Sequence, residues 1–181
     1  MQKGVDNEIS YVDDDPFLKA EAIERYMKSH ERIIFVDFGI SLDEKSIAQC
    51  FEKHEGVGCL VFPGVKEGID WELFKHKVQS GSTEPTEQMG LHFDTEIGAK
   101  ISDDIYKVKT TTSKAWCMNT KNVIKSIKDK KSGKWTINPK MFAKFTEQGV
   151  RIYAFTAAKL VMTYTHECIS NILNAAGVRV D

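Results

Sequence analysis

Lysine is concentrated in one segment of this sequence. Residues 107–134 contain nine lysines and one acid, Asp129. Like charges on adjoining elements repel one another, so a polyanion that neutralises them is a natural partner for the segment. Because the segment relies on lysine and arginine is nearly absent, it suits contacts along a phosphate backbone better than bidentate recognition of particular bases.

Aromatic residues lie among these lysines. Trp116 and Trp135, with Tyr106 nearby, could stack on unpaired bases, as aromatic side chains do in proteins that bind single strands. The alternative is a solvated helix face beside two tryptophans of the core. The candidate nucleic-acid-binding residues are Lys107, Lys109, Lys114, Trp116, Lys121, Lys125, Lys128, Lys130, Lys131, Lys134 and Trp135.

A second group has the character of metal ligands. His92, Asp94 and Glu96 alternate along the sequence, so they share one face if this stretch is extended. An imidazole and two carboxylates could hold Mg²⁺ or Mn²⁺, with Lys100 near enough to assist a nuclease or hydrolase reaction. A polar face of an edge strand would produce the same pattern. We expect no cofactor unless this metal site exists.

Charge is also divided unequally along the whole chain. The net charge of −1 conceals a charge of −11 over residues 1–104, with 22 Asp+Glu and 11 Lys+Arg, and of +10 over residues 105–181, with 4 and 14. Such asymmetry indicates an anionic partner, or attraction between the halves of one molecule or of neighbouring copies. It predicts nucleic-acid binding and a homo-oligomer formed through the oppositely charged halves. Neutralisation within one molecule would remove the basis for both.

Length and composition are those of a globular protein. The 181 residues, 41% hydrophobic and 28% charged, suffice for one domain with its own core. We expect a flexible N-terminal arm over residues 1–15 and a single globular domain over residues 16–181. The acidic N-terminus lacks the apolar run of a signal peptide, which predicts an intracellular, cytoplasmic protein or a virion assembled there. The four cysteines have no CxxC spacing, and we expect them to be reduced.

Capping residues and periodicity predict the elements before residue 150. Asp15 and Pro16 predict a helix start, and Ser41 with Glu44 has the spacing of a capping box for a second helix. Strands are predicted at 33–38 and 59–62, a helix at 71–78, a hairpin around 102–104, and helices after 120 and 138. The helix after residue 120 is amphipathic. Its predicted inward residues are Val123, Ile124 and Ile127, and its outward residues are Lys121, Lys125 and Lys128.

The longest apolar stretch covers residues 150–176 and ends at Gly177. Apolar residues occupy every side of its helical wheel, which predicts a long helix buried all round. A membrane span is the rival interpretation, but Lys159, His166 and Glu167 interrupt the run, so we expect no membrane association. The predicted fold is α+β, with a mostly helical C-terminal half around the 150–176 helix and a small sheet in the N-terminal half.

The charge pattern favours a non-enzymatic, self-associating protein that binds nucleic acid, single-stranded RNA above all. A small viral coat protein or nucleoprotein has this combination of properties. Two alternatives stay open. One is a metal-dependent nuclease or hydrolase that uses His92, Asp94 and Glu96, and the other is an adaptor whose acidic surface docks a basic partner.

Overall fold

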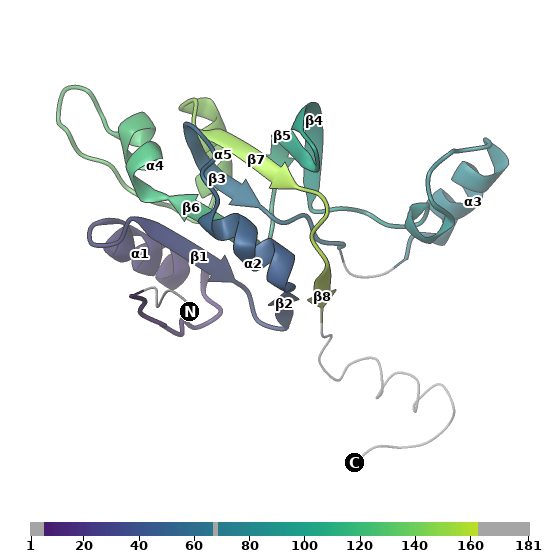
Figure 1. Cartoon of the computed structure of the whole chain (residues 1–181), viewed down its shortest axis with the longest axis horizontal. Helices are drawn as coiled ribbons and strands as arrows, with labels where there is room; N and C mark the ends of the chain where they lie inside the picture. Colours follow the sequence, from purple (N-terminus) through teal and green to yellow (C-terminus); the bar gives the residue numbers. More distant parts are fainter. Residues whose placement is uncertain (1–5, 67–68, 163–181) are drawn as a thin grey trace, which may run out of the picture.

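The computed structural model describes residues 6–66 and 69–162. Its strands and helices follow one another in mixed order along the chain (Figure 1). Their bounds are α1 (Pro16–Met27), β1 (Arg32–Val36), β2 (Ile40–Leu42), α2 (Glu44–Phe51), β3 (Val57–Val61), α3 (Trp71–Gln79), the 3₁₀ helix η1 (Thr86–Gln88), β4 (Thr95–Ser102), β5 (Ile105–Thr111), β6 (Ala115–Asn119), α4 (Thr120–Ile127), α5 (Met141–Glu147), β7 (Arg151–Phe155) and β8 (Leu160–Met162).

A mixed sheet of six strands forms the centre of the described structure, in the order β1-β6-β3-β7-β5-β4. β3 lies in its middle, where it pairs antiparallel with β6 and parallel with β7. All five residues of β3 are buried, as expected for a strand that is covered on both faces. β2 and β8 form a separate antiparallel ribbon.

The sheet separates two clusters of buried apolar side chains. On one face, α1, α4 and α5 pack over a cluster that contains Cys59 and Trp116. On the other face, α2 and the β2-β8 ribbon pack over a cluster that contains Leu60 and Cys117. Consecutive residues of one strand therefore enter different clusters, which is the period-two geometry of a strand.

The prediction of a mostly helical C-terminal half with a small N-terminal sheet is wrong. Residues 151–155 and 160–162 are the strands β7 and β8, and the sheet extends through the middle and C-terminal parts of the described chain. Ile152 and Ala154 enter one apolar cluster and Phe155 the other. A strand buried on both faces is apolar at every position, as a fully buried helix is, so the helical wheel cannot separate the two. The rest of the predicted helix, residues 163–176, lies outside the described residues.

Helix caps were more reliable signals than apolar runs. Asp15 caps α1 by accepting two backbone N–H groups of the first turn at 2.8 and 2.9 Å, and Pro16 is the first helical residue, as predicted. α2 begins later than predicted, because Asp43 is its cap and Ser41 belongs to β2. β6 is absent from the predicted elements, because four of its five residues are buried and show no alternation.

α3 stands apart from the sheet (Figure 1). A narrow stalk, formed by residues 64–66 and 92–94, carries it. In the stalk the Lys66 N–H donates to the His92 carbonyl at 2.7 Å, and the Asp94 N–H donates to the Gly64 carbonyl at 3.0 Å. No residue of α3 is buried, and Trp71 is 66% exposed. We call residues 69–91 the α3 module. The exposed apolar side chains of its helix, Trp71 and Val78, are therefore open to a partner.

Neither a membrane-spanning helix nor a disulfide occurs in the described part of the chain. No helix there has the length and apolar character needed to cross a bilayer. Cys50, Cys59 and Cys117 are buried free thiols, whereas Cys168 lies outside the described residues. Burial raises the pKa of the Cys59 thiol, which keeps it protonated and unreactive.

Gly58→Ala tests how closely the central strand is packed. A methyl group at this position of β3 would collide with the side chain of Val150 and come within 3.1 Å of Val123. We expect it to lower the free energy of unfolding by about 1–3 kcal/mol, the usual cost of overpacking, in urea denaturation. Gly98→Ala on β4 is the control, because its methyl would meet its nearest neighbours at an ordinary 3.5 Å. Equal stability of the two variants would contradict the described packing of α4 and β7 against β3.

Candidate nucleic-acid interface

The chain that follows α4 forms a closed turn built on Asp129. Its Oδ1 accepts from the Lys131 N–H at 3.0 Å, the Ser132 N–H at 2.6 Å and the Ser132 hydroxyl at 2.8 Å. Across the turn, the Asp129 N–H donates to the Lys134 carbonyl at 2.9 Å. Gly133 has a positive φ of 67°, a conformation that glycine adopts without strain. The hydrogen bonds, that from the Ser132 N–H first, hold the pKa of Asp129 below its ordinary value.

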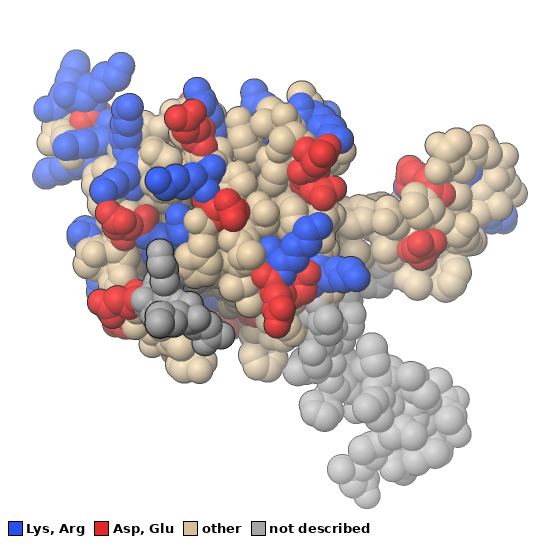
Figure 2. Space-filling model, in the orientation of Figure 1, with Lys and Arg blue, Asp and Glu red and all other residues tan. Residues whose placement is uncertain are grey.

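We call residues 128–134 the lysine turn. Lys128, Lys130, Lys131 and Lys134 are all exposed, and none of them forms an ion pair with another described residue. Asp129 is the single acid of the turn, so the four ammonium groups share one counter-charge, and four lysines less one aspartate leave the turn with a net charge of +3. Figure 2 shows the resulting concentration of basic side chains over α4 and the loop after it, at the upper left of the view.

α4 continues this basic surface and is amphipathic, as predicted. Lys121 and Lys125 are exposed on its outer side. Lys121 pairs with Glu31 at 2.7 Å, and because the two side chains are 78% and 81% exposed, the pair is easily displaced by another anion. Two of the predicted inward residues are buried and the third packs against the same cluster; they are Val123, Ile127 and Ile124.

The other lysines of the candidate set lie on the sheet, away from the lysine turn. Lys107 and Lys109 are exposed residues of β5, and Lys109 pairs with Glu96 of β4 at 2.8 Å. Lys114 is exposed just before β6 and lines a cavity on the face that α1 and α5 cover. The nine lysines therefore do not form one surface, and the lysine turn with α4 is their densest group.

The two candidate tryptophans have different surroundings. Trp116 is 2% exposed and stacks on Phe35 with ring centroids 5.1 Å apart, so it is a core residue and its ring is not open to a base in this conformation. Trp135 is half-buried, and the Lys28 Nζ lies 5.9 Å from its ring centroid, within the range of a cation–π contact.

Two lysines outside the candidate set adjoin this surface. Lys28, beside Trp135, caps the C-terminus of α1 and is remote in sequence, so only the fold could reveal it. Lys140 is an exposed lysine six residues after Lys134. A wider limit on the basic segment would have included it.

The structure does not bring His92, Asp94 and Glu96 together. His92 pairs with Asp70 of the α3 module at 2.8 Å, and Glu96 pairs with Lys109 at 2.8 Å. β4 begins one residue after Asp94, so the extended face that the alternation required does not include His92 and Asp94. Among the described residues, no group of three His, Cys, Asp or Glu side chains could hold a metal ion. The metal-dependent reaction stays a prediction without an assembled ligand set in this part of the chain.

Asp94 instead joins the stalk of the α3 module to the sheet. Its Oδ1 accepts from the Gly64 N–H at 3.1 Å and from the Thr95 hydroxyl at 2.7 Å. Burial raises its pKa above the ordinary value, although these hydrogen bonds act in the opposite direction. The ionised carboxylate is thus less stable in the folded protein than in the unfolded chain.

The chain matches no protein-family model, and comparisons with curated proteins and with solved structures found no match. Its function is therefore inferred from its own residues. Of the arrangements described above, the lysine turn has the most definite chemistry, because hydrogen bonds to Asp129 hold a short backbone segment that carries four exposed lysines.

Asp94→Asn should gain stability relative to the wild type as the pH rises. The amide oxygen still accepts from Gly64 and Thr95 but does not ionise. Because the folded pKa of Asp94 is raised, its contribution to stability is complete below the ordinary pKa of 3.8 and is lost as the pH rises through the folded value. The free energy of unfolding of the variant minus that of the wild type should increase between about pH 3 and pH 7 in urea titrations.

The matched control for the lost charge is Asp103→Asn, at a side chain that is 100% exposed. A difference between Asp94→Asn and wild type that stays constant with pH would contradict the raised pKa. Mn²⁺ added to the same samples tests the metal hypothesis. A rise in the melting temperature of the wild type that Asp94→Asn lacks would support it.

Proposed function

We propose that the protein is a non-enzymatic, self-associating protein that binds single-stranded RNA, and that the lysine turn is the centre of its binding surface. The observation that carries the proposal is the group of exposed, unpaired ammonium groups on a turn that Asp129 holds closed. A closed turn loses little conformational freedom when phosphates bind. Lysines bind phosphates as point charges without regard to sequence. These properties suit a coat protein or nucleoprotein that acts in the cytoplasm or in a virion assembled there.

Neutralisation of the basic half by the acidic half is limited. Among the ion pairs of the described residues, two join the halves, namely Lys109 with Glu96 and Lys121 with Glu31. Both pairs are exposed, so salt and a competing polyanion weaken them readily. The remaining pairs lie within residues 1–104, as Lys19 with Asp37 does. The described lysines of the basic half are therefore largely available to a partner.

Self-association is supported by the position of the α3 module. It lies at the opposite end of the long axis from the lysine turn (Figure 1). The module carries four acids and two lysines, and its Trp71 and Val78 side chains are 66% and 51% exposed. An acidic end and a basic end on one molecule favour head-to-tail contacts between copies, and such contacts extend into chains or close into rings.

The double variant Lys130→Gln/Lys131→Gln tests the binding surface. Both lysines are exposed, so the melting temperature should be nearly unchanged. Each lysine that neutralises a phosphate of a single strand contributes about 0.7 to the slope of log K against log salt, so the pair should flatten the slope by about 1.4. Fluorescence anisotropy with a labelled decauridylate over a series of salt concentrations measures this.

The matched control removes the same charge elsewhere. Lys53→Gln/Lys159→Gln replaces two lysines that are exposed and form no ion pair with another described residue, and it should leave the slope close to that of the wild type. If both double variants flatten the slope equally, binding depends on net charge alone and the lysine turn is not its centre. If the wild-type protein does not bind the strand, the result favours the adaptor hypothesis over nucleic-acid binding.

The double variant Glu72→Gln/Glu87→Gln tests self-association through the α3 module. After nuclease treatment, sedimentation of the wild type should show oligomers at low salt that dissociate as salt is added, because contacts between exposed charges are screened. The variant should dissociate at lower salt. The control, Glu52→Gln/Glu55→Gln, changes two exposed acids outside the module and should sediment as the wild type does. A wild type that is monomeric at every salt concentration would contradict this part of the proposal.

A further inference from the structure

A cavity of about 570 Å³ opens on the face of the sheet that α1 and α5 cover. Phe35 and Phe142 form its aromatic floor over the buried Trp116: Trp116 stacks on Phe35 with the ring planes 12° apart, and Phe142 meets Trp116 edge-on with centroids 6.0 Å apart. Phe35 and Phe142 are half-buried and both line the cavity. The Lys19 Nζ lies 5.8 Å from the Phe35 ring centroid, so Phe142 is the ring of the floor without a cation over it among the described residues. A cavity of this size with an apolar floor and a few polar groups suits a small organic ligand.

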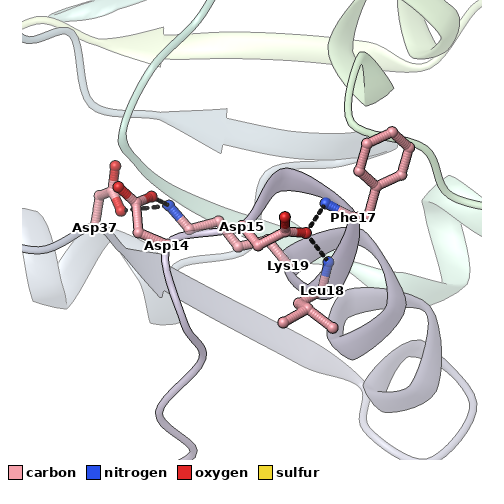
Figure 3. Close-up of polar contacts among 6 residues, drawn as sticks. All are labelled: Asp14, Asp15, Phe17, Leu18, Lys19 and Asp37. Atoms are coloured by element: carbon pink, nitrogen blue, oxygen red, sulfur yellow. Dashed lines mark hydrogen bonds and ion pairs between the residues drawn. The ribbon is translucent and has the colours of Figure 1, made fainter.

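The rim of the cavity carries two exposed cations that form no ion pair with any described residue, Lys114 and Lys140. Three lysines and one acid line the cavity, but the Lys19 Nζ is held by Asp14 at 2.6 Å and Asp37 at 2.9 Å, as Figure 3 shows. The pKa of Asp14 is lowered by its hydrogen bond to Lys19 and, to a smaller extent, by the charge of Lys114. The ligand that fits this charge distribution is an anion with a flat apolar body.

The chain that follows the lysine turn leads to the cavity, whose lining includes Asn138 and Lys140. The chain from Lys134 to Lys140 runs beside α1, where the Lys28 Nζ lies 5.9 Å from the Trp135 ring and the Ile137 N–H donates to Glu24 at 3.0 Å. Six residues of extended chain span at most about 20 Å. Lys134 and Lys140 lie at the two ends of this stretch, and Lys28, which pairs with Glu24 at 3.5 Å, lies beside it.

We infer that the cavity binds one nucleotide unit, with the base above the aromatic floor and its phosphate between Lys114 and Lys140. The inference rests on the proposed function, because the strand that the lysine turn holds would deliver this nucleotide. A base provides the flat apolar body, and the phosphate provides the negative charge. Asn138 also lines the cavity, and its amide could donate to the base while its Oδ1 accepts the Lys140 N–H at 3.0 Å.

Filling the cavity tests the inference without changing any charge. Ala143 lines the cavity from α5 and is exposed, so Ala143→Trp places an indole where the base would lie. It should weaken decauridylate binding by about tenfold, the effect of losing one stacked base, while the salt slope stays unchanged. Thr146→Trp is the control, on the same helix at an exposed position outside the cavity lining. Lys114→Gln/Lys140→Gln should instead flatten the salt slope by about 1.4.

The outcomes separate this inference from the proposed function. If the two tryptophan variants bind the strand equally well while Lys130→Gln/Lys131→Gln binds it less well, the cavity is not a nucleotide site and the proposed function stands. If the wild type does not bind the strand, the proposed function fails. Calorimetry with free uridine 5′-monophosphate then tests whether the cavity binds a nucleotide on its own. Binding that Ala143→Trp abolishes would then support a site for the free nucleotide, and no binding would overturn the inference. Equal binding of glucose 6-phosphate would also overturn it, because the base would not be recognised.

Discussion

The parallel pairing of β3 with β7 is the contact on which the rest of the structure depends. β3 belongs to the acidic half of the sequence and β7 to the basic half, and the two strands lie side by side in the middle of the sheet. Gly58 of β3 has no side chain, which allows Val123 of α4 and Val150 to approach this strand closely. The position of α4 over the sheet therefore depends on β3 as well. The oppositely charged halves are consequently parts of one core and not two lobes. Their charges can act only at the periphery, where solvent and partners reach them.

What the sequence predicted correctly depends on a few neighbouring residues. The cap made by Asp15 and Pro16, the short helix after Asp70, the hairpin of β4 and β5 and the amphipathic α4 all have local signals. β6 and β7 were missed, because burial on both faces removes the alternation by which strands are recognised. The start of α2 depends on distant chain as well. Ser41 could cap a helix, but it pairs with Val161 in the β2-β8 ribbon, and Asp43 takes its place.

The candidate site shows the same division between local and distant information. The lysines of the turn could be identified because the number of charges in a segment needs no fold. The role of Asp129 could not, since in sequence it is a lone acid that reduces the charge, whereas in the structure it closes the turn that presents the lysines. Lys28 joins the surface only because α1 packs beside Trp135. His92, Asp94 and Glu96 alternate in the sequence, but each contacts a different partner in the structure, namely Asp70, Gly64 and Lys109. The metal site that the alternation predicts stays a prediction.

The basic surface and the cavity lie on one side of the sheet because α1, α4 and α5 share one apolar cluster. Trp116 lies in that cluster and also under the cavity, so the packing that stabilises the fold also shapes the site. Mutual repulsion among the ammonium groups of the lysine turn opposes its closure, and the hydrogen bonds of Asp129 offset that repulsion. Added salt screens the repulsion, and a bound polyanion removes it. The turn should therefore be most strained in the free protein at low salt, and binding of a polyanion should stabilise the same conformation that Asp129 already holds.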